Sequence, residues 1–246
     1  MKHYRWQIAL AAALIAATAV MYLGHWLMFG DAHHIFIYLV GDIAFLPIEV
    51  LLVTLVLHQL LQRHEKHERF SKLNMVVGAF FSEVGNDLIS RLSKCDSEID
   101  STRGLLAVTG EWSARQFSAA NAKLRRRQPQ MMLKAEQLPI LKDSLQSKRE
   151  FLLRLLENPN LLEHQRVTDL LWAVFHLAEE LSHRPDLSSL PQSDIDHLSG
   201  DVRRVYMSLL GEWTAYMGHL KKEYPYLFSL ALRTNPLNPQ ASAVVA

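Results

Sequence analysis

Two long segments near the N-terminus contain almost no charged residues, and they restrict the possible folds more than any other feature of the chain. The first runs from Trp6 to Phe29 without a Lys, Arg, Asp or Glu. The second runs from Ile35 to Leu61 and is interrupted only by Asp42, Pro47 and Glu49. About 20 helical residues cross the ~30 Å hydrocarbon core of a bilayer. The sequence therefore predicts a transmembrane hairpin in residues 1–61, with helices over residues 6–29 and 35–61.

The rest of the chain has the composition of a soluble domain. Almost all of the 26 basic and 25 acidic residues follow residue 61. This division excludes a wholly soluble protein and a disordered chain. The net charge of +1 gives no reason to expect a nucleic-acid partner. Cys95 has no second cysteine to pair with, and its position on an apolar helix face predicts a small buried side chain rather than a reactive thiol.

The basic residues beside the two apolar segments predict the orientation of the hairpin. Lys2 and Arg5 precede the first segment, and the loop at residues 30–34 contains no Lys or Arg. Since basic flanks stay on the cytoplasmic side, both termini are expected in the cytoplasm. Anionic lipid headgroups attract basic side chains next to a membrane helix. The candidate headgroup contacts follow the second segment and are Arg63, Lys66, Arg69 and Lys72.

A cleaved signal peptide is the alternative interpretation of the first segment. Lys2 and Arg5 resemble the basic start of such a peptide, and Ala17-Thr-Ala19 resembles a cleavage site. The apolar sequence nevertheless continues from Val20 to Phe29, past that site. This continuation favours a membrane helix.

Asp42 and Glu49 are the most informative residues of the hairpin, because a carboxylate in hydrocarbon is energetically costly. Their spacing of seven residues places them on one helix face. Counted outward from the loop, His25 lies within one turn of Asp42, so the three residues form a candidate intramembrane polar site. Two interpretations stay open, namely a proton or ion relay and polar contacts that fix hairpin or dimer packing.

The second membrane helix is expected to continue into the soluble part, because no Gly or Pro occurs between Ile48 and Val77. Apolar residues then recur with the three-and-four spacing of one buried helix face. Gly78 and Gly85 predict a close approach by another helix, which would offset the destabilising effect of glycine in a helix. The apolar face consists of Phe70, Leu73, Val77, Phe80, Val84, Leu88, Leu92, Cys95 and Ile99.

The remaining segments predict an all-α fold, in which residues 62–236 form a cytoplasmic helical bundle. No stretch alternates between apolar and polar residues for long enough to form a strand. Residues 237–246 are expected to be a disordered tail. The predicted helices cover residues 111–127, 141–157 and 161–183, a long helix capped by Ser193, and a short helix that begins at Pro225.

No motif in the bundle indicates an enzyme, a cofactor or a metal site. Glu180-Leu-Ser-His183 has the Glu-x-x-His spacing of diiron bundles, with His176 one turn earlier, and Asp194-Ile-Asp-His197 is the nearest second copy. A helical wheel places His176, Glu180 and His183 opposite the apolar stripe of their helix. We therefore expect these side chains to be exposed and to bind no metal.

Two features suggest contact with partners. Trp172 and Phe175 lie on the outer side of the same helix and form a candidate partner surface. Arg125-Arg126-Arg127 could bind an acidic partner or return to the bilayer, although a solvated helix end is the simpler interpretation.

The segment Tyr224-Pro-Tyr-Leu-Phe-Ser-Leu-Ala231, together with Phe70 to Asn86, carries a resemblance. The chain resembles uncharacterised prokaryotic membrane proteins that have an N-terminal transmembrane hairpin and a cytoplasmic helical domain. The resemblance implies a location in the cytoplasmic membrane and supplies neither an activity nor site residues.

These observations favour a membrane-anchored helical interaction or regulatory module without a catalytic site. Its expected partners are the lipid bilayer and either another protein or further copies of itself, and nucleic acid is not expected. The alternative function is a small oligomeric transport or channel component that uses Asp42 and Glu49 within the membrane.

Overall fold

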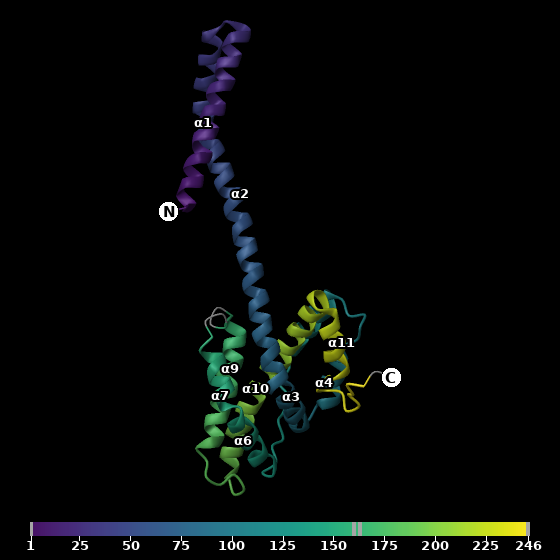
Figure 1. Ribbon diagram of the computed structural model, residues 1–246. Helices are drawn as coiled ribbons and strands as arrows, with labels where there is room; N and C mark the ends of the chain where they lie inside the picture. The colour runs from purple at the N-terminus through teal and green to yellow at the C-terminus, as the bar shows by residue number, and fades with distance from the viewer. Residues whose placement is uncertain (1, 159–160, 162–163, 245–246) are drawn as a thin grey trace. The chain divides into compact units, whose positions relative to one another are not determined.

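The computed structural model describes residues 2–158, 161 and 164–244, and the side chains of these residues except 2–5 and 60–72. The described part of the chain is helical and contains no strand (Figure 1). Its only bridge is an isolated antiparallel contact between Asp96 and Met131. The chain divides into two compact units, Met1–Lys66 and His67–Ala246. The predicted all-α fold class is confirmed.

The first unit is a hairpin of two apolar helices, α1 (Lys2–Phe29) and the beginning of α2 (Ala32–Phe80). Gly30 adopts a φ of 64°, a conformation that glycine reaches without steric cost. The Asp31 carboxylate accepts hydrogen bonds from the backbone N–H groups of His33 and His34, at 2.9 Å and 3.2 Å. Because Asp31 caps α2 in this way, the connection is shorter than the expected loop at residues 30–34.

By length and composition, the segments Trp6–Phe29 and Ala32–Gln59 could each cross a membrane. The helix α2 includes Pro47 without ending there. It continues to Phe80, as the absence of helix-breaking residues predicted.

Beyond Phe80 the expected continuous helix is divided into shorter helical segments. A π-helical turn η1 (Phe81–Gly85) is followed by α3 (Asn86–Leu92), a 3₁₀ turn η2 (Ser93–Cys95) and α4 (Ile99–Leu105). The apolar face from Leu73 to Cys95 is buried as predicted, and the side chain of Phe70 lies outside the described residues. The rise and twist of the backbone change at η1. The same apolar face nevertheless stays buried on both sides of this turn.

The long helix α10 (Gln192–Glu223) is the centre of the second unit. It packs against α9 (Gln165–Ser182), α5 (Ala114–Leu124), α3 and α11 (Pro225–Arg233). Its buried face is apolar with the helical repeat and extends from Leu198 to Leu220. Helix α9 in turn contacts α6 (Gln137–Ser147) and α7 (Arg149–Leu156).

Three expected helix boundaries need correction. Helix α5 begins after Ser113, whose side chain forms a capping box with Gln116, and not near residue 111. The helix expected over residues 141–157 is two helices separated at Lys148. Helix α10 begins directly after Pro191, so Ser193 is not its cap.

The C-terminal helix begins at Pro225, as predicted, but only part of its apolar face is buried. Phe228 is buried, whereas Tyr226, Leu227 and Leu230 are exposed. The expected tail starts with Leu237, which is buried and whose carbonyl accepts a hydrogen bond from Arg103 at 3.1 Å. Residues 245–246 lie outside the described residues.

Candidate functional site

Two pairs of side chains meet where α9 packs on α10. His176 and Glu180 lie one turn apart on α9, and His197 and Asp201 lie one turn apart on α10. Residues four positions apart occupy the same face of a helix, so each helix presents one imidazole and one carboxylate to the contact. We call these four residues the histidine–carboxylate cluster.

The distances within the cluster are short and similar to one another. The Asp201 Oδ2 atom lies 3.4 Å from His197 Nε2 and 3.5 Å from His176 Nε2. The Glu180 carboxylate lies 3.7 Å from His197 Nε2 and 3.8 Å from His176 Nε2. One ligand atom each from Glu180, His197 and Asp201 falls within 4.8 Å of the other two.

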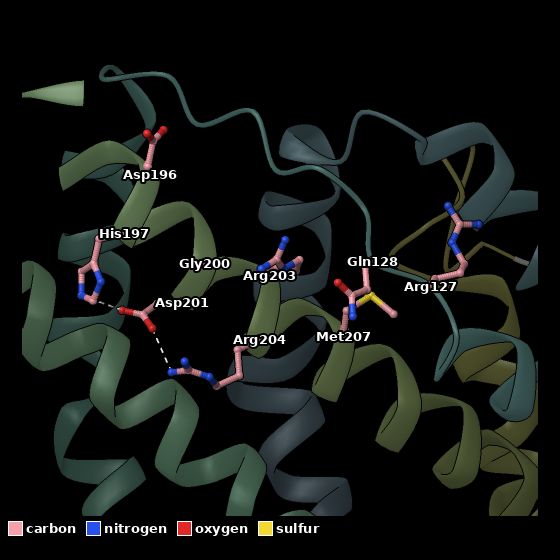
Figure 2. A pocket seen from close by; sticks show the side chains of 9 residues that line it. All are labelled: Arg127, Gln128, Asp196, His197, Gly200, Asp201, Arg203, Arg204 and Met207. Atoms are coloured by element: carbon pink, nitrogen blue, oxygen red, sulfur yellow. Dashed lines mark hydrogen bonds and ion pairs between the residues drawn. The ribbon is translucent and has the colours of Figure 1, made fainter. Parts of the chain in front are cut away.

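Asp201 is the buried centre of this cluster, with 3% of its surface exposed. Its Oδ1 atom accepts a hydrogen bond of 2.8 Å from Arg204. Its Oδ2 atom has no hydrogen-bond donor in the described part of the chain, although the two imidazoles face it. Figure 2 shows Asp201 between His197 and Arg204.

Arg184 holds the neighbouring carboxylates in place. Its guanidinium donates to Glu180 Oε2 at 2.7 Å and to both carboxylate oxygens of Asp194 at 2.6 Å and 2.7 Å. This hydrogen bonding lowers the pKa of Glu180 and of Asp194 below their ordinary values. Since Arg184 lies two residues beyond the end of α9 and Asp194 lies in the first turn of α10, the pairs connect the two helix ends.

His176 is exposed, as predicted, whereas the prediction that Glu180 faces solvent is corrected. Helix α10 covers this side of α9, and only about a quarter of the Glu180 side chain stays exposed. His183 follows the prediction better, since it is exposed and its Nδ1 atom lies 2.8 Å from the carbonyl of Glu179. A helical wheel of one helix cannot show which neighbour covers its polar face.

Asp201 was not among the site residues predicted from the sequence. The sequence does contain a repeated pattern that points to it, a histidine four residues before a carboxylate. The pattern occurs at His176 and Glu180 and again at His197 and Asp201. Two such pairs on consecutive helices can meet only if the helices pack with matching register. The sequence does not determine that register.

A row of three hollows lined by arginines lies along α10, and we call it the arginine groove. The first hollow, of about 500 Å³, includes Arg127, Arg203 and Arg204 in its wall (Figure 2). The second, of about 330 Å³, shares Arg127 with the first. The third, of about 660 Å³, shares Arg125 and Arg166 with the second and adds Arg126. His197 and Asp201 also line the first hollow, so the cluster borders the groove.

Some of these arginines are neutralised within the domain. Arg127 pairs with Glu98 at 2.8 Å, and Arg166 pairs with the buried Glu212 at 3.0 Å. Burial raises the pKa of Glu212, and the charge of Arg166 opposes that shift. No side-chain hydrogen bond or ion pair of Arg125, Arg126 or Arg203 occurs among the residues that the structure describes.

The candidate partner surface is less open than expected. Trp172 is 55% exposed, and its ring meets that of Phe175 edge to face. Phe175 is only half-buried, and Arg149 lies over its ring at 5.4 Å while also bonding to Glu179. The pair thus forms part of an α7–α9 contact, with Trp172 at its edge.

The residues predicted to act in the membrane are not drawn together by the hairpin. Asp42 and Glu49 are both exposed on α2. The ring of His25 stacks on His34 with centroids 6.0 Å apart, and no contact with Asp42 occurs among the described side chains. The side chains of the expected headgroup contacts lie outside the described residues, namely Arg63, Lys66, Arg69 and Lys72.

Cys95 is buried, as predicted. Its thiol lies 3.4 Å from the side-chain oxygen of Gln137, and burial raises its pKa. A raised pKa reduces the fraction of reactive thiolate.

Comparison with known proteins gives consistent matches along the chain. A family model described as the N-terminal helical domain of MJ1433 matches residues 1–61, and one described as the C-terminal helical domain of the uncharacterized protein MJ1433 matches residues 69–233. The uncharacterized protein MJ1433 of Methanocaldococcus jannaschii is 42% identical over 238 residues, which cover 97% of this chain and 96% of that protein. No solved structure matches the chain.

Proposed function

The chain belongs to the family of the uncharacterized protein MJ1433, and we propose that it is a membrane-anchored module that binds an acidic segment of another protein. The apolar hairpin is the anchor, and the arginine groove of the helical domain is the binding surface. The observation that carries the proposal is the set of groove arginines that form no side-chain hydrogen bond or ion pair among the described residues, namely Arg125, Arg126 and Arg203. No catalytic residue is assigned.

The chemistry of the groove favours carboxylates as its ligands. A guanidinium group presents a planar fork of donors that matches a carboxylate, and such pairs are often bidentate. Among the described residues, Arg126 and Arg203 form no side-chain hydrogen bond or ion pair, and Arg125 acts only through its charge, which lowers the pKa of Glu212. Acidic side chains of a partner would supply the missing counter-charges.

The acidic residues of the groove argue against nucleic acid as the partner. Asp196 and Asp201 line the first hollow, and Asp169 and Glu212 line the second. A continuous phosphate backbone would meet these carboxylates as well as the arginines, whereas nucleic-acid surfaces are predominantly basic. A peptide, in contrast, can carry acidic residues at the positions that face the arginines and neutral residues at the positions that face the carboxylates.

The length of the groove suits a peptide segment. The hollows follow α10 from Asp196 to Gly218. At 1.5 Å per helical residue this distance is about 33 Å. An extended segment of about ten residues spans the same length, given at most ~3.3–3.6 Å per residue.

The hairpin supports the anchoring part of the proposal. Its two helices are long and apolar enough to cross a bilayer, and their large side chains are exposed along the whole length. Apolar surface on this scale requires cover, and lipid provides it. The distribution of Lys and Arg favours a cytoplasmic location for both termini.

The groove is tested by reversing its charge in the full chain. Cells would express the C-terminally tagged protein, partners would be crosslinked, and stoichiometric partners would be identified by mass spectrometry after mild solubilisation. We expect Arg125→Glu/Arg126→Glu to remove a partner that wild type retains. The crosslinked residues of that partner should lie in a segment rich in Asp and Glu. Binding should weaken as the salt concentration rises, because the charges of the groove are exposed to solvent.

The matched control carries the same charge change on the same helix. Arg115 and Lys123 are exposed on α5 and lie outside the groove. Arg115→Glu/Lys123→Glu should retain the partner. Equal loss in both variants, or a partner whose contact is not acidic, would contradict the proposed groove. Recovery of further copies of this chain alone would instead indicate a homo-oligomer.

A further inference from the structure

We propose that Glu180, His197 and Asp201 bind one Zn²⁺ ion at the contact of α9 and α10, with His176 beside them as the candidate fourth ligand. This inference goes beyond the interaction function and does not depend on it. The site is built by two helices that pack against each other over most of the length of α9. A bound ion would therefore fix the relative position of the two helices.

Three ligand atoms of the cluster lie close enough together to share one ion. One atom each from Glu180, His197 and Asp201 lies within 4.8 Å of the other two. Zinc binds imidazole nitrogen and carboxylate oxygen at about 2.0–2.1 Å, which places neighbouring ligand atoms about 3.4 Å apart in a tetrahedral site. His197 Nε2 lies 3.4 Å from Asp201 Oδ2 and 3.7 Å from Glu180 Oε2. His176 Nε2 lies 3.5 Å from the same Asp201 oxygen but approaches the other oxygen of Glu180, so it is the candidate for the fourth position.

The buried oxygen of Asp201 is the independent sign of a missing ligand. A buried charged oxygen without a donor is destabilising, because it has lost its water and gained no bond. Oδ2 is in that position, while Oδ1 is already bonded to Arg204. Because two imidazole Nε2 atoms face Oδ2, a cation among the three atoms satisfies all of them.

The ligand types favour zinc over magnesium and calcium. Imidazole suits zinc and other late first-row metals, whereas magnesium and calcium prefer oxygen ligands throughout. The surroundings also resemble those of metal sites, in which hydrogen bonds hold the ligating carboxylates in orientation. Arg184 does so for Glu180, and Arg204 does so for Asp201.

The site is accessible from solvent. About half of each imidazole is exposed, and the Asp201 carboxylate lies beneath them. His197 and Asp201 line the first hollow of the groove, which provides a route for the ion. Access of this kind is required for metal exchange in a folded domain.

Ion pairing without a metal is the competing explanation. Protonated His176 and His197 would then each serve as a cation for the two carboxylates. Such pairing would not respond to zinc. Metal binding, in contrast, requires deprotonated imidazoles and is therefore weakened by acid.

The experiment titrates Zn²⁺ into the full chain, purified in detergent and stripped with a chelator. We expect one ion per chain by calorimetry, with weaker binding in acid because the ligands must be deprotonated. Asp201→Asn and His197→Gln should each weaken binding at least tenfold, since each removes a direct ligand. Substituted Co²⁺ should show the strong visible absorption of a four-coordinate site.

Two substitutions on the same helices serve as controls. His183→Gln changes a histidine of the α9 C-terminus, and Asp196→Asn changes a carboxylate that accepts a hydrogen bond from Gln192 at 2.9 Å. Both should bind Zn²⁺ like wild type. If Asp201→Asn does not fold, His176→Gln replaces it, because that side chain lies at the exposed rim. Absence of binding, or equal binding in ligand and control variants, would overturn the assignment.

Discussion

At the scale of single residues, Arg184 shows how one side chain organises the candidate site. Its guanidinium is mostly buried and bonds to Glu180 and Asp194 at the same time. Both carboxylates are held in fixed orientation, which a flexible lysine ammonium would not achieve with the same geometry. The lowered pKa values of the two carboxyl groups record this stabilisation of their charged forms.

Replacing Arg184 with Ala should lower the stability of the helical domain at neutral pH but not in acid. The carboxyl pKa values lie below the ordinary 4.5 and 3.8 in the folded protein. The stabilisation is therefore complete above those ordinary values and is lost as the pH falls through the lower folded values. Denaturant unfolding followed by circular dichroism, between pH 7 and pH 3, measures the difference from wild type.

Arg154→Ala is the control for this prediction. Arg154 pairs with Glu150 one turn away, and both side chains are largely exposed at 72% and 90%. Such surface pairs contribute about 0–1 kcal/mol, so the substitution should change stability little at any pH. A destabilisation by Arg184→Ala that stays constant between pH 7 and pH 3 would show that its ion pairs are not the cause.

At the scale of helices, the contact of α2 with α10 depends on the missing side chain of Gly78. A Cβ atom there would lie 2.7 Å from the hydroxyl of Tyr216. The ring of Tyr216 is itself stacked on Phe81, with centroids 5.5 Å apart, which limits its freedom to move. At Gly78 the neighbour is therefore a side chain of α10, the Tyr216 ring, which occupies the space of the missing Cβ. At Gly85 the nearest atoms belong to Phe81 and Phe80 of the same segment, so no second helix explains that glycine.

Gly78→Ala should change stability in opposite directions in two backgrounds. In wild type the clash with Tyr216, typically worth about 1–3 kcal/mol, outweighs the better helix propensity of alanine. In the Tyr216→Phe background the hydroxyl is gone, and Gly78→Ala should stabilise by up to about 1 kcal/mol. Unfolding of the four proteins gives the coupling energy directly. Additive effects of the two substitutions would refute a direct contact between position 78 and the hydroxyl of Tyr216.

At the scale of the whole molecule, the two units have opposite surfaces. The hairpin exposes large apolar side chains along both helices, whereas the helical domain buries its apolar residues around α10. This contrast supports the proposal that one unit lies in lipid and the other in water.

The proposed topology predicts opposite labelling of the loop and the C-terminal end. In a Cys95→Ser background, Ala32→Cys places a thiol at the hairpin turn and Ser242→Cys places one near the C-terminus. A membrane-impermeant maleimide on intact cells should label Ala32→Cys only, because both termini are expected in the cytoplasm. Both thiols should react after permeabilisation. Labelling of Ser242→Cys in intact cells would reverse the orientation, and equal labelling of both would contradict a hairpin.

The sequence alone determined the helical character and the order of the parts. Apolar periodicity from Leu73 to Cys95 identified a buried face, and Pro225 identified the start of the last helix. These features are local, because a helix forms its backbone hydrogen bonds within its own segment and repeats its buried face every 3.6 residues. The predicted helix boundaries were wrong at Ser113 and Lys148, where local backbone and side-chain interactions end or begin a helix.

Only the tertiary structure decided which polar side chains meet. His176 and Glu180 are separated in sequence from His197 and Asp201 by a helix end and a loop, and a one-residue change of register would move the second pair to another face. The register of α9 against α10 is set by their buried leucines and valines. The cluster is therefore a consequence of apolar packing, which depends on the whole domain, and no periodicity within either helix specifies it.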